Sequence, residues 1–376
     1  MDNATVFVYS ARLKTGFALV CPTCWLDCGK HASTNSQGHF AIDGLNPDLK
    51  FRLLVVKNGF KAATVRGVDP AQEAFPPITL HARAATDNPS QIVKGRVLDA
   101  GGSPVPGALV EPEALKFGPG GMYSGSPPDW VDPLAATNAQ GEFEIVSGQP
   151  FTEITLRISP RGLAAKLVTE PAGATPQVTL TEGATVVGRL VQSDGKSVAG
   201  AEVALFSFSN TMGESFDEMR VGTAKDGSFA FSNVPAGRVW GLYPKTDSLA
   251  ARNLAARPQW CETNADGKVV NFGKLTLRPG FVVRGKVELS DKKDIPPGMH
   301  VTLVAEWDIN NRLTKIAPDG SFEFKGLAAG VYRLIPDVRG YALSGDAIGE
   351  LLVERDRQNV AMRMAPRRET TLSSGL

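Results

Sequence analysis

The densest group of chemically active side chains lies in a cysteine-rich segment near the N-terminus. Cys21, Cys24, Cys28 and His31 fall within eleven residues, in the pattern Cys-x-x-Cys-x-x-x-Cys-x-x-His. Three thiolates and an imidazole form a ligand set that suits tetrahedral zinc, and thiolates also bind iron. The same cysteines could instead form a disulfide that clamps the loop, or stay reduced, and an oxidising compartment favours the disulfide. We assign no metal here.

The remaining sequence contains no recognisable catalytic motif. Cys261 is either a leftover thiol or a staple to the first cysteine segment. The Cys21-Pro-Thr-Cys24 stretch has the spacing of a redox motif but not its βαβ context. None of the four histidines is followed by Glu at the third position, and there is no nucleophile elbow, P-loop or dinucleotide fingerprint. We therefore assign no catalytic residue and predict that the chain is not an enzyme.

Aromatic side chains are the other candidates for binding. Tyr123 and Trp130 lie in a Gly/Pro-rich stretch, residues 117–130, that reads as a long loop insertion. Trp25 lies inside the cysteine segment. A loop tryptophan can stack on a sugar or anchor a protein interface, although ordinary packing explains most of them. The other tryptophans are weaker candidates: Trp240, Trp260 and Trp307.

One nine-residue motif must position all of these side chains, because it occurs four times. The copies span residues 34–42, 137–145, 223–231 and 316–324, with the pattern Thr-x-x-x-Gly-x-Phe-x-apolar. The fourth copy has Ile316 in place of Thr. Gly supplies the positive φ of a tight turn, and the alternating residues after it are typical of a half-buried strand. We expect a hairpin in each copy, with the Phe side chains anchoring four separate cores.

The flanking segments repeat as well. A Gly-x-apolar strand precedes copies two to four, at residues 95–97, 188–190 and 285–287, and a second alternating strand follows every copy. Spacings of 103, 86 and 93 residues separate Gly38, Gly141, Gly227 and Gly320. This period has the size of an immunoglobulin-like sandwich and exceeds that of a solenoid repeat.

The chain is thus predicted to be all-β, a tandem array of four Ig-like or transthyretin-like (prealbumin-like) β-sandwich domains. The expected boundaries are 1–85, 86–180, 181–278 and 279–365, followed by a flexible tail at 366–376. The first copy begins directly at Ala4-Thr5-Val6, so its first strand looks missing, and we expect the native chain to start upstream of Met1, with a signal peptide once present. Short strand-turn-strand joints predict a stiff, rod-like array.

The repeats resemble the carboxypeptidase regulatory-like domain. The resemblance rests on Gly-x-Val, then Gly-Ala-x-Val, then Thr-x-x-x-Gly-x-Phe-x-Ile, and covers nearly the whole chain in four copies. This family implies a transthyretin-like sandwich of about seven strands, found beside zinc carboxypeptidases and in secreted or surface proteins of bacteria. Related Cna-B-like surface modules crosslink a Lys to an Asn, and we assign no such triad here.

Composition narrows the function further. The 376 residues carry a net charge of +1 with acids and bases interspersed, which argues against nucleic acid or an anionic membrane as partner, and no segment has the length of a membrane span. We predict a non-catalytic structural or adhesive protein, extracellular, cell-surface or periplasmic. It would bind a protein or glycan, or self-assemble through edge strands. The alternatives are a carbohydrate-binding accessory protein and a metal- or thiol-dependent activity at Cys21–His31.

Overall fold

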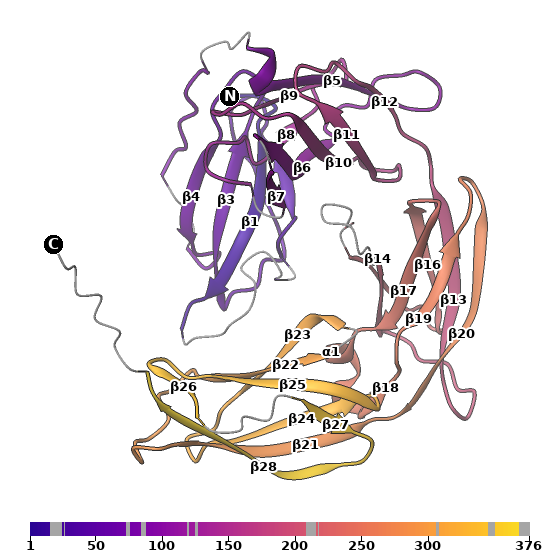
Figure 1. Ribbon diagram of the computed structural model, residues 1–376. Coiled ribbons are helices and arrows are strands. Elements are labelled where there is room, and N and C mark those ends of the chain that lie inside the picture. Colours follow the sequence, from indigo (N-terminus) through magenta and orange to yellow (C-terminus); the bar gives the residue numbers. More distant parts are fainter. Residues whose placement is uncertain are drawn as a thin grey trace, which may run out of the picture.

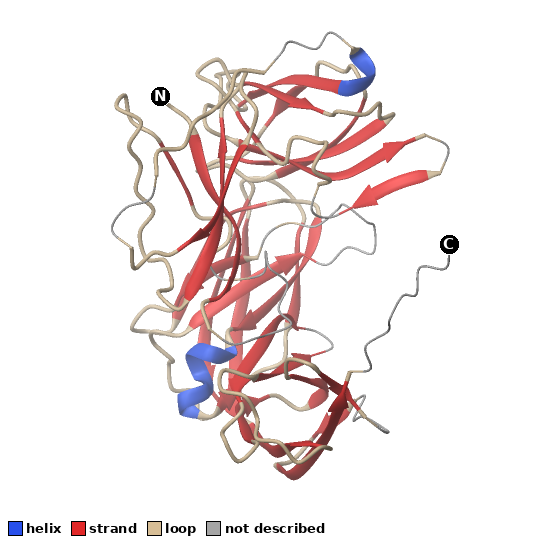
Figure 2. Ribbon diagram, turned by 90° about the vertical axis from the view of Figure 1, so that its left-hand side faces the viewer, coloured by secondary structure: helices blue, strands red, loops and turns tan. Residues whose placement is uncertain are grey.

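The computed structural model describes residues 1–15, 25, 27–72, 76–83, 88–118, 120–124, 127–207, 216, 218–305, 308–344 and 350–367. Within these ranges the chain is built from strands, and helix is limited to η1 (Pro89–Gln91), α1 (Thr246–Leu249) and η2 (Ala250–Arg252) (Figure 2). The predicted all-β array of sandwich domains is confirmed. None of the helices in the described ranges is long and apolar enough to cross a membrane.

The units follow one another around an open arc (Figure 1). The first and second units lie together at the top of the view, the third lies on the right, and the fourth closes the lower side. The array is therefore curved, and the rod-like form predicted from the sequence is not observed. The joints are short as predicted, but each one turns the chain.

The first unit is a sheet in the order β2-β1-β3-β4. Its strands are β1 (Thr5–Leu13), β2 (His31–Ser33), β3 (Leu49–Val56) and β4 (Ala63–Val68). One face packs on a core around Val6, Phe51 and Leu53, which side chains from outside the strands also cover, among them Phe40, Ile42, Ile78 and Leu80.

The other face of this sheet meets the second unit. Phe7, Leu54 and Val56 pack there against Leu109 and Leu134. Because β3 faces apolar side chains on both sides, almost every one of its residues is buried. Burial on both faces explains why β3 ends in the uninterrupted apolar run Leu-Leu-Val-Val, without alternating polar residues.

The second unit is a sandwich of two sheets. One has the order β12-β5-β9, from β5 (Ile92–Leu98), β9 (Glu142–Val146) and β12 (Gln177–Thr179). The other runs β11-β10-β6-β7, with β8 also on β6. Its strands are β6 (Leu109–Phe117), β7 (Gly121–Ser124), β8 (Ala135–Ala136), β10 (Glu153–Ser159) and β11 (Lys166–Pro171).

The third unit repeats this plan. Its first sheet is β16-β13-β20-β18, from β13 (Ala184–Gln192), β16 (Ser228–Val234), β18 (Leu254–Ala255) and β20 (Val269–Pro279). Its second sheet is β15-β14-β17-β19, from β14 (Glu202–Ser207), β15 (Met219–Gly222), β17 (Arg238–Pro244) and β19 (Gln259–Thr263).

The fourth unit has the same two-sheet arrangement. One sheet is β24-β21-β28-β26, from β21 (Phe281–Leu289), β24 (Ser321–Leu327), β26 (Tyr341–Leu343) and β28 (Arg357–Pro366). The other is β23-β22-β25-β27, from β22 (His300–Ala305), β23 (Asp308–Lys315), β25 (Gly330–Asp337) and β27 (Leu351–Val353). The predicted tail lies outside the described residues beyond Arg367.

The repeated motif forms a tight turn, but not between paired strands. Gly227 has a φ of 78°, as a turn glycine should. However, β15 before the turn pairs with β14, whereas β16 after it pairs with β13 in the opposite sheet. The hairpin prediction is wrong in this respect. The Gly227 carbonyl accepts a hydrogen bond from the Leu190 N–H at 2.8 Å, which draws the chain after the turn onto the first strand.

The motif threonine closes the same corner. Thr223 is buried, accepts a hydrogen bond from the Ala201 N–H at 3.0 Å and donates one to the Val198 carbonyl at 2.7 Å. Thr137 in the second unit and Thr34 in the first make the equivalent pair of bonds. Each threonine thereby fixes the chain directly before β1, β6 or β14.

The motif phenylalanine packs across the first strand onto a glycine. Phe229 stands opposite Gly188 in the strand register, and a Cβ built on Gly188 would lie 2.5 Å from its Cζ. Phe143 over Gly95 and Phe322 over Gly285 repeat the contact. The three rings are at most 5% exposed, so the predicted anchoring of cores by Phe is confirmed in these units, while Phe40 is partly buried.

Gly188→Ala should therefore destabilise the third unit by about 1–3 kcal/mol, the usual cost of overpacking a filled core. The measurement is the shift of the urea unfolding midpoint. Gly222→Ala in β15 is the matched control, because nothing lies within 4 Å of its added Cβ. Equal midpoints for the two variants would contradict the role given to the glycine.

Candidate functional site

The cysteine segment is only partly described. Cys21 and Cys24 lie outside the described residues. The Cys28 N–H donates to the Trp25 carbonyl at 2.9 Å, and both side chains pack at the first core. The Nδ1 of His31 lies 3.0 Å from the Gly29 carbonyl oxygen. In the described ranges no three His, Cys, Asp or Glu side chains gather as metal ligands. The alternatives for this loop, a disulfide, a metal or reduced thiols, fall largely on residues outside those ranges.

Cys261 is a free thiol on β19. It packs against the core of the third unit, opposite Trp240 in the strand register. Of the two alternatives for Cys261, the structure thus agrees with the leftover thiol and not with the staple to the first unit. Burial raises the pKa of this thiol, because a thiolate loses its hydration there, and the reactive form is suppressed.

The tryptophans separate by their surroundings. Trp240 is fully buried in the third core, Trp260 is 54% exposed, and Trp307 lies outside the described residues. Trp130 is half-buried, with its ring edge-on to Phe117 at a centroid distance of 5.7 Å. It also lines a cleft, which makes it the tryptophan placed to meet a ligand.

Tyr123 is less accessible than its loop composition suggests. Its ring packs on the second core, and its buried hydroxyl has no hydrogen-bond partner among the described residues. Burial, followed by the nearby charges of Tyr9 and Glu113, raises the pKa of Tyr123 to about 12. The neutral phenol is thus the form present at physiological pH.

The cleft lies between the first two units and has a volume of about 680 Å³. The outer face of the first sheet forms one wall, and residues 127–133 and 146–148 of the second unit form the other. Its charged and aromatic lining includes Tyr9, Arg52, Lys61, Arg83, Trp130 and Asp132. This size is in the range of small-molecule sites.

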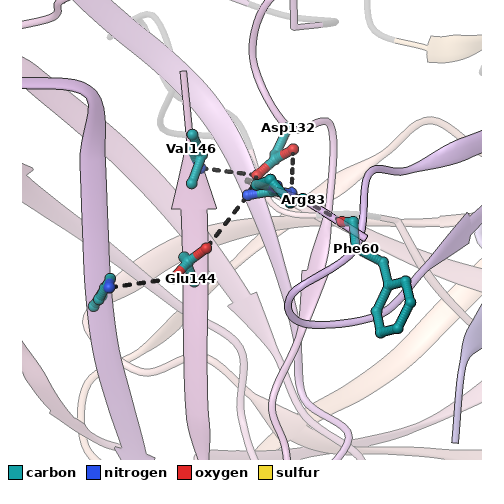
Figure 3. Close-up of polar contacts among 6 residues, drawn as sticks. Phe60, Arg83, Asp132, Glu144 and Val146 are labelled. Atoms are coloured by element: carbon teal, nitrogen blue, oxygen red, sulfur yellow. Dashed lines mark hydrogen bonds and ion pairs between the residues drawn. The ribbon is translucent and has the colours of Figure 1, made fainter. Parts of the chain in front are cut away.

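Arg83 joins the two units at one end of the cleft (Figure 3). Its Nη1 lies 2.7 Å from Asp132 Oδ2 and its Nη2 2.8 Å from Asp132 Oδ1, a two-point pairing of guanidinium and carboxylate. Nη1 also lies 3.4 Å from Glu144, and Nη2 donates to the Phe60 carbonyl at 3.1 Å. Arg83 thus connects three segments that are distant in sequence.

Asp132 is held by its surroundings as firmly as Arg83 is. Its Oδ2 accepts a hydrogen bond from the Val146 N–H at 2.8 Å. Burial raises the pKa of the Asp132 carboxyl, and the charge of Arg83 opposes the rise. The guanidinium therefore offsets part of the cost of burying this carboxylate.

The cleft thus combines the Arg83–Asp132 ion pair with two further cations, Arg52 and Lys61. Trp130 was expected from the Gly/Pro-rich stretch, whereas Arg52, Arg83 and Tyr9 were not. Arg52 carried a signal, since it is a charge directly before Leu54 and Val56 on one face of the strand. Arg83 carried none, because its partners come from the next unit.

Comparison by sequence assigns a family to part of the chain. Residues 279–365 match the model for the BOS complex subunit NOMO1-like, second beta sandwich domain. This range is the last sandwich unit and less than half of the chain. No curated protein matches the sequence significantly.

Comparison of structures matches solved bacterial proteins, two of which are pilins. The Bacillus anthracis TIE protein is 12% identical with a TM-score of 0.22, over 97% of this chain and 69% of that one. A streptococcal ancillary pilin is 12% identical with a TM-score of 0.26, over 74% and 99%. The shaft pilin SpaA of Lactobacillus rhamnosus GG is 10% identical with a TM-score of 0.21, over 49% and 98%.

Arg83→Met tests the clamp between the units. At pH 7 it should lower the free energy of unfolding by about 2–3 kcal/mol, because Asp132 is left charged, 16% exposed and unpaired. The loss should shrink as the pH falls through the Asp132 pKa, since a protonated carboxyl needs no cation. Urea unfolding at pH 7 and pH 4 measures both.

Lys116→Met is the control for this variant. It removes an exposed ion pair with Glu153 within the second unit, which should be worth less than about 1 kcal/mol at either pH. A loss for Arg83→Met that is as small as the control's, or that does not depend on pH, would contradict the clamp.

Proposed function

We propose that this chain is a non-catalytic structural or adhesive protein of the cell surface or the extracellular space, which holds binding surfaces at fixed spacing. The observation that carries the proposal is that side-chain-to-backbone bonds bridge the joints between the units. Such bonds set the angle between units, which a flexible linker would leave free.

The joint between the second and third units is bridged by Asn233. Its Nδ2 donates to the Gly162 carbonyl at 3.0 Å and to the Glu182 carbonyl at 2.9 Å. Thr181 adds a bond to Asp266 at 2.8 Å. The backbone of Asn233 is left-handed, with a φ of 57°, a conformation that Asn tolerates better than other residues with side chains.

The joint between the third and fourth units uses the same device. Asn253, with a φ of 48°, donates from Nδ2 to the Gly280 carbonyl at 2.9 Å and accepts from the Gly326 N–H at 2.9 Å. Gly280 is confined here, because an added Cβ would lie 2.6 Å from Gly326 Cα. Gly280 and Gly326 thus lie backbone to backbone at the joint, with no room for a side chain on Gly280.

The proposal also covers the type of domain, the domain boundaries and the partners. The units are carboxypeptidase-regulatory-like or Cna-B-like modules of a secreted bacterial protein, divided near residues 85, 180, 278 and 365. Edge strands such as β7 and β11 are available for self-assembly. The partners are a protein or a glycan at the cell surface.

A second function, carbohydrate binding, is favoured by one observation: Trp130 lines the cleft between the first two units. An indole at the wall of a cleft of this size is a stacking surface for a sugar ring.

Asn253→Ala tests the structural proposal. Losing two hydrogen bonds and placing Ala in a left-handed conformation should cost about 2 kcal/mol at the joint, and small-angle scattering should show a broader range of dimensions. Asn359→Ala is the matched control, because Asn359 is left-handed too (φ 58°) but is exposed in β28, away from the joints. Scattering curves that are identical for the two variants would contradict the proposal.

Trp130→Ala tests the second function. Binding on a glycan array should be lost in this variant and kept in Trp260→Ala, which removes an exposed indole of the third unit. Circular dichroism checks that both variants are folded. Equal binding by the two variants would exclude Trp130 as the contact.

A further inference from the structure

Arg52 is a cation on the face of the first sheet that meets the second unit. It lies on β3 two residues before Leu54, so it shares the face of Leu54 and Val56, both of which pack against the second unit. Where this apolar contact ends, the cleft begins, and Arg52 is one of its lining residues. The strand thus places a guanidinium at the edge of an apolar interface.

No protein carboxylate in the described ranges pairs with this guanidinium. The guanidinium instead lies over the ring of Tyr9, whose centroid is 4.9 Å from Cζ. Its Nε is buried and has no hydrogen-bond acceptor among the described residues. A buried N–H of a charged group without an acceptor is costly, and an anion in the cleft would supply one.

The rest of the lining leaves the cleft with positive charge near Arg52. Arg83 is neutralised by Asp132. Lys61 is exposed and adds a second cation, while Asp129, also exposed, is the remaining acid of the lining. Because Asp129 offsets Lys61, one net positive charge remains, which suits a group with a single negative charge better than a phosphate dianion.

The uncharged lining favours a sugar as the carrier of that charge. Tyr9 and Trp130 offer aromatic rings, and Ser10 and Thr64 are lining residues that carry hydroxyl groups. Rings for stacking and hydroxyls for hydrogen bonds are the groups that a pyranose engages. An acidic peptide could pair with the cation but has no sugar ring to stack on Tyr9 or Trp130.

We propose that the cleft between the first two units binds an acidic saccharide, with the carboxylate of a uronic acid paired to Arg52 and a sugar ring against Trp130. This inference rests on the carbohydrate-binding function above and narrows it to a ligand class. The guanidinium selects for the carboxylate, and the Tyr9 ring beneath holds it in place.

The test is calorimetric titration of the full chain with a uronate trisaccharide and with the same trisaccharide after reduction of its carboxyls to hydroxymethyl groups. The acidic form should bind about tenfold to a hundredfold more tightly, the range of a charged hydrogen-bonded pair. Arg52→Met should abolish this preference, and added salt should weaken only the acidic form.

Arg66→Met is the matched control. Arg66 stands opposite Arg52 on β4 and is exposed, and it does not line the cleft, so the variant loses the same charge from the same sheet. It should keep the preference for the acidic form, which shows that the contact matters and not the net charge.

Three results would overturn the inference: equal binding of the two trisaccharides, an unchanged preference in Arg52→Met, or binding of a glutamate-rich peptide in place of the saccharide. If Trp130→Ala abolishes binding of both sugars while Arg52→Met alters neither, carbohydrate binding stands and the selectivity for acid fails. If neither sugar binds, both ideas fail, and the structural proposal is tested separately by scattering.

Discussion

The packing of a phenylalanine ring across a glycine of the first strand is the constraint on which each complete sandwich depends. The ring can reach the core only where the strand opposite has no side chain, so Gly188 and Phe229 are required together. The turn glycine then bonds to the same first strand, which directs the chain from the second sheet back into the first. Two glycines and one aromatic ring thereby specify a corner that a local turn propensity could not specify alone.

The joints are an extension of this logic. The chain leaves one sandwich by its last strand and enters the next within a few residues, so the angle depends on whatever bonds lie at that point. Asn233 and Asn253 supply them, and both need a left-handed backbone that few residues accept. An array joined in this way keeps the curvature of its joints, which explains an arc in place of a rod.

The sequence predicts the repeated parts of this structure better than the parts that occur once. The motif recurs, so its strands, turns and buried rings could be inferred, and the Thr223 corner follows from the same pattern. The partner strands of β15 and β16 could not be inferred, because a turn determines the local direction of the chain and not which strand it pairs with. Trp130 stood out by its neighbours in the sequence, whereas Arg83 acts across units. The free thiol of Cys261 could not be inferred, because a disulfide depends on which distant residues the fold brings together.

The cleft has a physical cause in the shape of the first unit. A sandwich buries one face of each sheet, but the sheet of the first unit buries both, one in its own core and one against the second unit. The second contact is smaller than the sheet, so the face continues past it as an open wall. A charged residue at that boundary keeps its stem on apolar surface and its head at the cleft, as Arg52 does. Joining two units therefore forms a site that neither unit has alone, on a fold whose own interior is filled by side chains.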